Sequence, residues 1–189
     1  MELKRVVVTG LGAVTPIGND VQSFWQGLVN GTSGAADITK FDATNFKTQF
    51  ACEVKDFDVS QFLHRKESRK MDLFAQYAIA CSDEALADAG LDGEEPNVDH
   101  DRVGVIWGSG IGGFQTFMNE ALNFHESGGV PRFSPFFIPM MISDIAAGHI
   151  SIRHGFRGPN FCTVSACASG TNAMIDAFNY IRLGKAEVM

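Results

Sequence analysis

The sequence predicts an α/β fold in a single domain. Three short apolar runs, beginning at Arg5, Arg102 and Asn160, have the length and the β-branched or small side chains of buried strands. Longer segments with apolar residues at helical spacing lie between and after them. With 189 residues, of which 45% are hydrophobic and 20% charged, the chain is large enough to bury a sizeable core.

The first third of the chain begins with the strand predicted over residues 5–9, followed by a tight turn at Gly10–Gly12. Asn19 or Asp20 caps a predicted helix over residues 21–29, which ends at Asn30 and Gly31. Residues 32–64 are rich in phenylalanine interleaved with Asp and Thr, and predict irregular structure with short strands.

A charged segment then leads into a long helix. Apolar residues keep helical period from Met71 to Leu86, and Gly90 marks the end of this helix. The basic residues just before it are Arg65, Lys66, Arg69 and Lys70. Such a cluster is most often a solvated helix entry. On a chain of net charge −7 it also suits the docking of an acidic partner.

The strand predicted over residues 102–107 runs into a glycine-rich turn. Gly108, Gly110 and Gly113 formally match the dinucleotide-binding fingerprint. That fingerprint also needs an acidic residue at the end of a second strand about 20 positions later. Here the corresponding position falls in a loop at residues 125–129. Close approach of the backbone to another chain segment or a ligand therefore explains the glycines better, and a nucleotide-binding oxidoreductase is the less favoured alternative.

An apolar segment bracketed by prolines follows at residues 135–139 and contains Phe136 and Phe137. Unless it is buried, it predicts a subunit interface or a wall for a lipid-like ligand. Ser143 or Asp144 then caps a predicted helix that runs through Ile150.

Residues 160–170 are the most informative stretch. A strand gives way to a cluster of very small side chains and then to an amphipathic helix, so Cys167 is expected at a helix N-terminus. The free N–H groups and the helix dipole there favour the reactive thiolate and are able to stabilise an oxyanion. Cys167 is therefore a candidate nucleophile, and the alternative is a cysteine packed in the core.

Composition limits the other classes of function. The net charge of −7 argues against nucleic-acid binding, and no apolar run is long enough to insert into a membrane. Four irregularly spaced cysteines and the lack of a secretory signal suggest reduced thiols and the cytoplasm. The spacing of His149, His154, Cys162 and Cys167 does not suit a metal, so we expect neither a metal nor another cofactor. Residues 186–189 resemble the opening of a further strand, which indicates a fragment of something longer.

Several motifs in order resemble the β-ketoacyl-acyl-carrier-protein synthases, and most closely the type II elongating condensing enzymes of bacterial fatty-acid synthesis. They are residues 6–12 (VVVTGLG), 69–72 (RKMD), 108–113 (GSGIGG), 155–159 (GFRGP) and 165–170 (SACASG). The resemblance implies a thiolase-like fold of two similar halves, each a mixed five-stranded sheet covered by helices, in a homodimer. Residues 1–189 would form the N-terminal half, and the second half is absent.

The resemblance also implies roles for individual residues. Cys167 would accept a fatty acyl group from acyl carrier protein, and malonyl-loaded carrier protein would then decarboxylate and extend the chain by two carbons. Ile111 falls at the gate of the acyl pocket, and Phe136 and Phe137 would help to wall the partner subunit's pocket. The basic cluster at Arg65, Lys66, Arg69 and Lys70 fits the face that receives the carrier protein.

One departure from the family pattern limits these expectations. The family's two catalytic histidines and its lysine come from the second half, and none of the five histidines here lies in a matching motif. This chain alone is expected to hold the nucleophile without the decarboxylation machinery. A non-catalytic scaffold built on the same half-fold is the second alternative, and a type I synthase or a thiolase is a further possibility within the same class.

Overall fold

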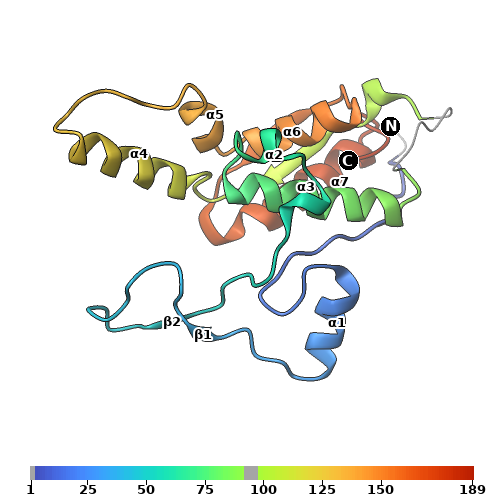
Figure 1. Cartoon of the computed structure of the whole chain (residues 1–189). Coiled ribbons are helices and arrows are strands. Elements are labelled where there is room, and N and C mark those ends of the chain that lie inside the picture. The colour runs from blue at the N-terminus through green and yellow to red at the C-terminus, as the bar shows by residue number, and fades with distance from the viewer. Residues whose placement is uncertain (1–2, 92–97) are drawn as a thin grey trace.

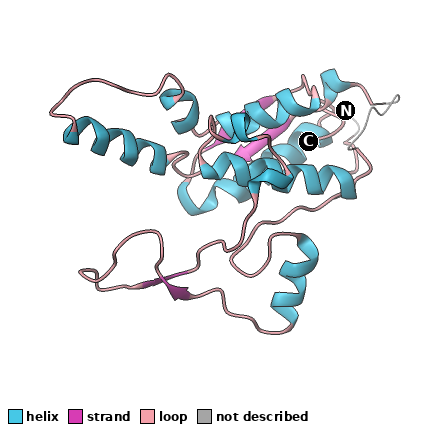
Figure 2. Ribbon diagram, viewed as in Figure 1, coloured by secondary structure: helices cyan, strands magenta, loops and turns pink. Residues whose placement is uncertain are grey.

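A computed structural model describes residues 3–91 and 98–189. Its main body contains a parallel pair of strands, β3 (Val105–Gly108) and β4 (Asn160–Thr163), with helices packed on them. Figures 1 and 2 show a smaller part beside this body, which holds α1 and the antiparallel ribbon β1–β2. The remaining elements are α1 (Val21–Val29), β1 (Ala36–Asp37), β2 (Phe50–Ala51), η1 (Val59–Gln61), α2 (Arg65–Ser68), α3 (Leu73–Asp88), η2 (His100–Arg102), α4 (Phe114–Glu126), α5 (Phe137–Met141), α6 (Ile145–His154), η3 (Ala166–Ala168) and α7 (Ser169–Arg182).

Local sequence signals set the ends of several helices as predicted. Asp20 caps α1 through a capping box with Ser23, and Gly31 follows the helix with φ +64°. Gly90, with φ +67°, follows α3, and Gly155 caps α6 in the left-handed conformation. None of the described helices is long and apolar enough to cross a membrane.

The core of the main body lies between α3 and α6. Half of its buried members are alanines, which let the two helices approach closely. The buried members are Leu63, Ala75, Ala78, Ile79, Ala146 and Ile150. Val105 and Trp107 of β3 pack against this cluster, and α7 also contacts both strands. The strand pair is thereby fixed in place by helices from both halves of the sequence.

The N-terminal segment differs from its prediction. Residues 5–9 are extended but form no ladder, and residues 10–13 run along α3 in place of a tight turn. A Cβ added to Gly10 or Gly12 would lie 2.0 Å from the Ala85 carbonyl oxygen or 1.9 Å from that of Cys81. Glycine is required at both positions because the backbones nearly touch.

Between this segment and β3 lies a cavity of about 610 Å³. Val6, Val7 and Val8 line one side, and residues 103–107 of β3 and its approach line the other. Among the lining residues, Val188 forms a parallel bridge with Val103, and the Gly104 N–H donates to the Val188 carbonyl oxygen at 3.0 Å. Of the strand opening predicted at residues 186–189, only the bridge at Val188 forms, and in place of five strands the described part of this sheet contains β3, β4 and this one bridge.

Three further predictions shift in detail. The strand expected over residues 102–107 begins only at Val105, because η2 occupies residues 100–102. The basic residues do not join the long helix, since α2 ends at Ser68 and Asp72 caps a new helix, α3. The apolar segment after Pro135 is not wholly a loop, because α5 begins at Phe137.

Candidate active site

The strand-to-helix turn after β4 carries Cys167 as predicted. The chain leaves β4 at Thr163, forms the short turn η3, and enters α7 at Ser169. Cys167 lies in η3 and is exposed. The residue that caps α7, Ala168, makes no side-chain cap hydrogen bond, and the Ser169 N–H donates to the Ala166 carbonyl. Cys167 therefore lies in the turn immediately before α7.

A set of hydrogen bonds holds this turn in an unusual conformation. Ala166 has φ +49°, which is rare for a residue with a Cβ. The Ser169 hydroxyl, only 3% exposed, donates to the Ala166 carbonyl at 2.7 Å and accepts from the Ser165 N–H at 2.9 Å. Thr163 Oγ1 donates to the Ser169 carbonyl at 2.8 Å, and Asn172 donates to Ser165 Oγ at 2.6 Å. Strained residues of this kind concentrate at functional sites.

The glycine-rich segment 108–113 packs directly on the Cys167 turn. A Cβ at Gly108 would lie 2.5 Å from backbone atoms of Ser169 and Gly170, and one at Gly110 would lie 3.5 Å from Ala166. These contacts confirm that the glycines serve close backbone approach. Ile111 lies on the same segment with its side chain 70% exposed.

The two phenylalanines lie beyond this segment, at the start of α5. Phe137 stacks on Phe117 of α4 and on Phe133, at centroid distances of 6.4 and 5.7 Å. Phe136 is exposed, and Lys70 Nζ lies 5.0 Å from the centre of its ring. In Figure 1, α4 and α5 form an arm that projects from the main body. The structure therefore places Phe136 next to the basic cluster, and Phe137 within the aromatic side of the arm.

The basic cluster occupies α2 and the turn after it. Its four members, Arg65, Lys66, Arg69 and Lys70, are all exposed. His64 caps the short helix: its Nδ1 accepts the Lys66 N–H, and its own N–H donates to Glu67. Asp72, which ends this segment, is buried, and its carboxylate accepts a hydrogen bond from Thr116. Because the two residues are 44 positions apart, the sequence did not predict this contact.

The other cysteines have different environments. Burial raises the pKa of Cys81 and of Cys162, which disfavours their thiolates. Cys52 is exposed but lies beyond β2, away from any helix start. Cys167 is the cysteine that combines exposure with a helix N-terminus.

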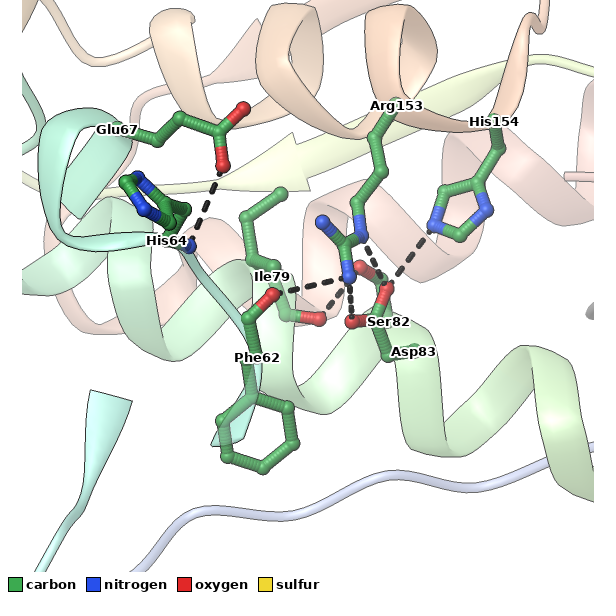
Figure 3. A network of polar contacts seen from close by, with 8 residues as sticks. All are labelled: Phe62, His64, Glu67, Ile79, Ser82, Asp83, Arg153 and His154. Carbon is green, nitrogen blue, oxygen red and sulfur yellow. Dashed lines mark hydrogen bonds and ion pairs between the residues drawn. The ribbon is translucent and has the colours of Figure 1, made fainter. Parts of the chain in front are cut away.

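Two of the histidines lie on α6. One of them, His154, belongs to a network of polar contacts between α3 and α6. Arg153 donates to both oxygens of Asp83 at 2.8 and 2.7 Å, and His154 Nε2 lies 3.1 Å from the same carboxylate (Figure 3). Burial alone would raise the pKa of Asp83, but the bonds from His154 and Arg153 outweigh it, so the pKa is lowered. Burial lowers the pKa of His149, whose Nε2 has no hydrogen-bond partner. The contacts of Asp83 with Arg153 and His154 join α3 to α6.

Comparison with known proteins identifies the architecture. Residues 3–189 match the family model described as "Beta-ketoacyl synthase, N-terminal domain". A 3-oxoacyl-[acyl-carrier-protein] synthase 2 from Synechocystis sp. is 49% identical over the whole chain, and one from Vibrio harveyi is 47% identical. The chain spans about 45% of the length of each of these two relatives.

Solved structures agree. A β-ketoacyl synthase from Burkholderia phymatum superimposes with a TM-score of 0.82 at 30% identity, covering 97% of this chain and 45% of its own. A type II polyketide ketosynthase, described in complex with its acyl-carrier protein, gives a TM-score of 0.78 at 26% identity, covering 97% of this chain and 49% of its own. The predicted fold class is confirmed as that of these thiolase-like ketosynthases. The chain belongs to the β-ketoacyl synthase family and corresponds to its N-terminal domain.

Proposed function

We propose that this chain is the nucleophile-bearing half of a 3-oxoacyl-[acyl-carrier-protein] synthase 2 that elongates fatty acyl chains. One observation carries the proposal: an exposed cysteine at a helix N-terminus, in a turn with positive φ at Ala166 that the Ser169 hydroxyl holds. The high identity to synthases of that name agrees with it. A scaffold without catalysis has no use for such a turn.

In the first half-reaction the Cys167 thiolate attacks the thioester carbonyl of an acyl-loaded carrier protein. A new carbon–sulfur bond forms on Cys167, the bond to the carrier's sulfur breaks, and the carrier leaves as a thiolate that takes up a proton. The carbonyl oxygen becomes negative in between. We assign the stabilisation of this charge to backbone N–H groups at the turn into α7.

In the second half-reaction malonyl-loaded carrier protein loses carbon dioxide. The carbanion that remains attacks the Cys167 thioester, a carbon–carbon bond forms, and the cysteine leaves as a thiolate. The product is a 3-oxoacyl chain two carbons longer. We assign the groups that assist decarboxylation to a second, C-terminal half, as the family resemblance implies.

Surface properties support the second half and a homodimer. The chain exposes 12155 Å², whereas a compact protein of 20.5 kDa is expected to expose about 8,850 Å². Exposed apolar side chains concentrate in the α4–α5 arm and include Phe114, Phe117, Leu122, Phe124 and Phe133. The cavity beside β3 is bounded by the unpaired residues 6–8 and is lined mainly by apolar side chains. We assign the cavity to the second half, and the arm to a second copy of the chain.

The proposed partner is acyl carrier protein, loaded with acyl or malonyl groups. Arg65, Lys66, Arg69 and Lys70 give this acidic chain a local positive face. A related ketosynthase is described in complex with its acyl-carrier protein, which supports this assignment. Ile111, on the segment beside Cys167, is assigned to the gate of the acyl pocket, and Phe136 and Phe137 to its wall. The free state of all four cysteines agrees with a cytoplasmic location.

A direct test is to incubate the intact protein with acyl-loaded carrier protein and to map the acyl group by mass spectrometry. We expect one acyl group on Cys167, and none on a Cys167→Ala variant. A Cys162→Ala variant is the matched control and should be acylated normally. Acylation at another residue, or none, contradicts the proposal.

A further inference from the structure

Asp72 joins the beginnings of two helices. Asp72 is buried, with only 8% of its surface exposed. Oδ1 caps α3 by accepting the Phe74 N–H at 3.4 Å. Oδ2 accepts both the N–H and the hydroxyl of Thr116 in α4, at 2.9 and 2.6 Å.

For α4 this remote carboxylate takes the place of a local cap. The residue at the N-cap, Gly113, has no side chain, and Thr116 is the third residue of the helix. An N-cap side chain normally accepts the N–H of that third residue. Asp72 supplies the same bond from 44 residues away and so fixes where α4 starts.

The start of α4 in turn holds the glycine segment 108–113. A Cβ on Gly113 would lie 3.1 Å from Asp72 Cβ and 2.1 Å from the Met140 carbonyl oxygen, so this end of the segment has no free space. The other end, at Gly108, presses on the backbone of Ser169 in the Cys167 turn. The segment is therefore a short backbone bridge from Asp72 to the candidate nucleophile.

In the sequence, Asp72 lies two residues after the end of the basic cluster. Arg69 and Lys70 precede it by three and two residues. Lys70 lies over the ring of Phe136, one residue before α5, and α5 packs on α4. The basic cluster is thus connected to the glycine segment along two routes, one through Asp72 and one through Phe136.

We propose that Asp72, through its paired hydrogen bonds to Thr116, is a positioning residue that couples docking at Arg69 and Lys70 to the placement of residues 108–113 beside Cys167. The coupling to docking rests on the proposed function, whereas the positioning of the segment does not.

The test uses Thr116→Val, which keeps the shape and the backbone N–H bond but removes the hydroxyl bond, and Thr116→Ser, which restores it. Amide hydrogen exchange of residues 108–113 is the first readout, because it needs no activity. We expect exchange to become at least about five-fold faster in the valine variant, the loss expected for one buried hydrogen bond, and to recover in the serine variant. Thr44→Val is the matched control: Thr44 makes the same pair of bonds to Asp42, at 3.0 and 2.6 Å, on an exposed loop.

The second readout is the rate of Cys167 acylation by octanoyl- and hexadecanoyl-loaded carrier protein in the intact protein. We expect Thr116→Val to change the ratio of kcat/KM for the two chains by about three-fold or more, with Thr116→Ser and Thr44→Val close to wild type. Unchanged exchange over residues 108–113, or a serine variant as impaired as the valine variant, overturns the positioning role. Faster exchange with an unchanged acylation ratio overturns the coupling. A wild-type protein that is never acylated contradicts the proposed function instead, while the exchange readout still decides the positioning role.

Discussion

Gly108 and Gly170 meet backbone to backbone: a Cβ placed on Gly108 would lie 2.5 Å from the Gly170 nitrogen. The end of β3 and the first turn of α7 are therefore in contact with no side chain between them. This contact sets the distance between the glycine segment and the turn that holds Cys167.

Replacing Gly108 with alanine should separate these two backbones. We expect a loss of about 1–3 kcal/mol in the free energy of unfolding, as for other overpacked sites, together with slower modification of Cys167. Urea denaturation and timed alkylation measure the two effects. Gly148→Ala in α6 is the control, since its Cβ would meet open space, and it should be neutral or stabilising by up to about 1 kcal/mol. Equal behaviour of the two variants would show that the contact is unimportant.

Iodoacetamide at neutral pH should modify Cys167 well ahead of the other cysteines in the intact protein. Cys81 and Cys162 react slowly because burial raises the pKa of each. Cys52 is the informative comparison, because it is exposed but lies at no helix start. Peptide mass mapping gives all four rates. A Cys52 rate equal to that of Cys167 contradicts activation by α7.

Reversing two charges in the basic cluster should weaken carrier docking. We expect Arg69→Glu with Lys70→Glu to raise the KM for acyl-loaded carrier protein about ten-fold at low salt, and the difference should shrink as salt screens the charges. Lys47→Glu with Lys55→Glu, two exposed changes away from the basic cluster in the sequence, gives the same change in net charge and is the control. A KM that does not change at low salt removes the cluster from the docking surface.

The Asp83 network predicts a pH-dependent contribution to stability. Because the pKa of Asp83 is lowered in the folded protein, its ionised form stabilises the fold above its unfolded pKa, and this contribution is lost as the pH falls through the folded value. Asp83→Asn should therefore lower the free energy of unfolding by about 1 kcal/mol near pH 7, after allowance for partial exposure, and by less near pH 3. Thermal unfolding across this range measures the difference. Asp101→Asn, in the exposed pair with Arg157, should change little at either pH, and a pH-independent effect at Asp83 would exclude the network as its source.

Signals that lie close together in the sequence predicted the structure well. The Asp20 cap and Gly31 locate α1, and the small residues before Ser169 locate the turn that carries Cys167. Each of these features is decided within a few residues by capping and backbone sterics.

Contacts between segments that are distant in the sequence could not be predicted from these local signals. The valine-rich residues 6–8 have strand character, yet a strand requires a neighbour, and the described structure places a cavity there. Thr116 shows no sign in the sequence of its bond to Asp72, because any of the acidic residues could have supplied it. The capping role of Asp72 itself was accessible, since an acidic residue before an apolar helical run is a start signal.

The left-handed backbone at Ala166 has a consequence for the chemistry at its neighbour. The free-energy cost of the positive φ at Ala166 is already included in folding, and the Ser169 hydroxyl holds this conformation. A molecule that reaches the Cys167 sulfur thus encounters a preorganised surface, with no refolding of the turn needed before bonds begin to change.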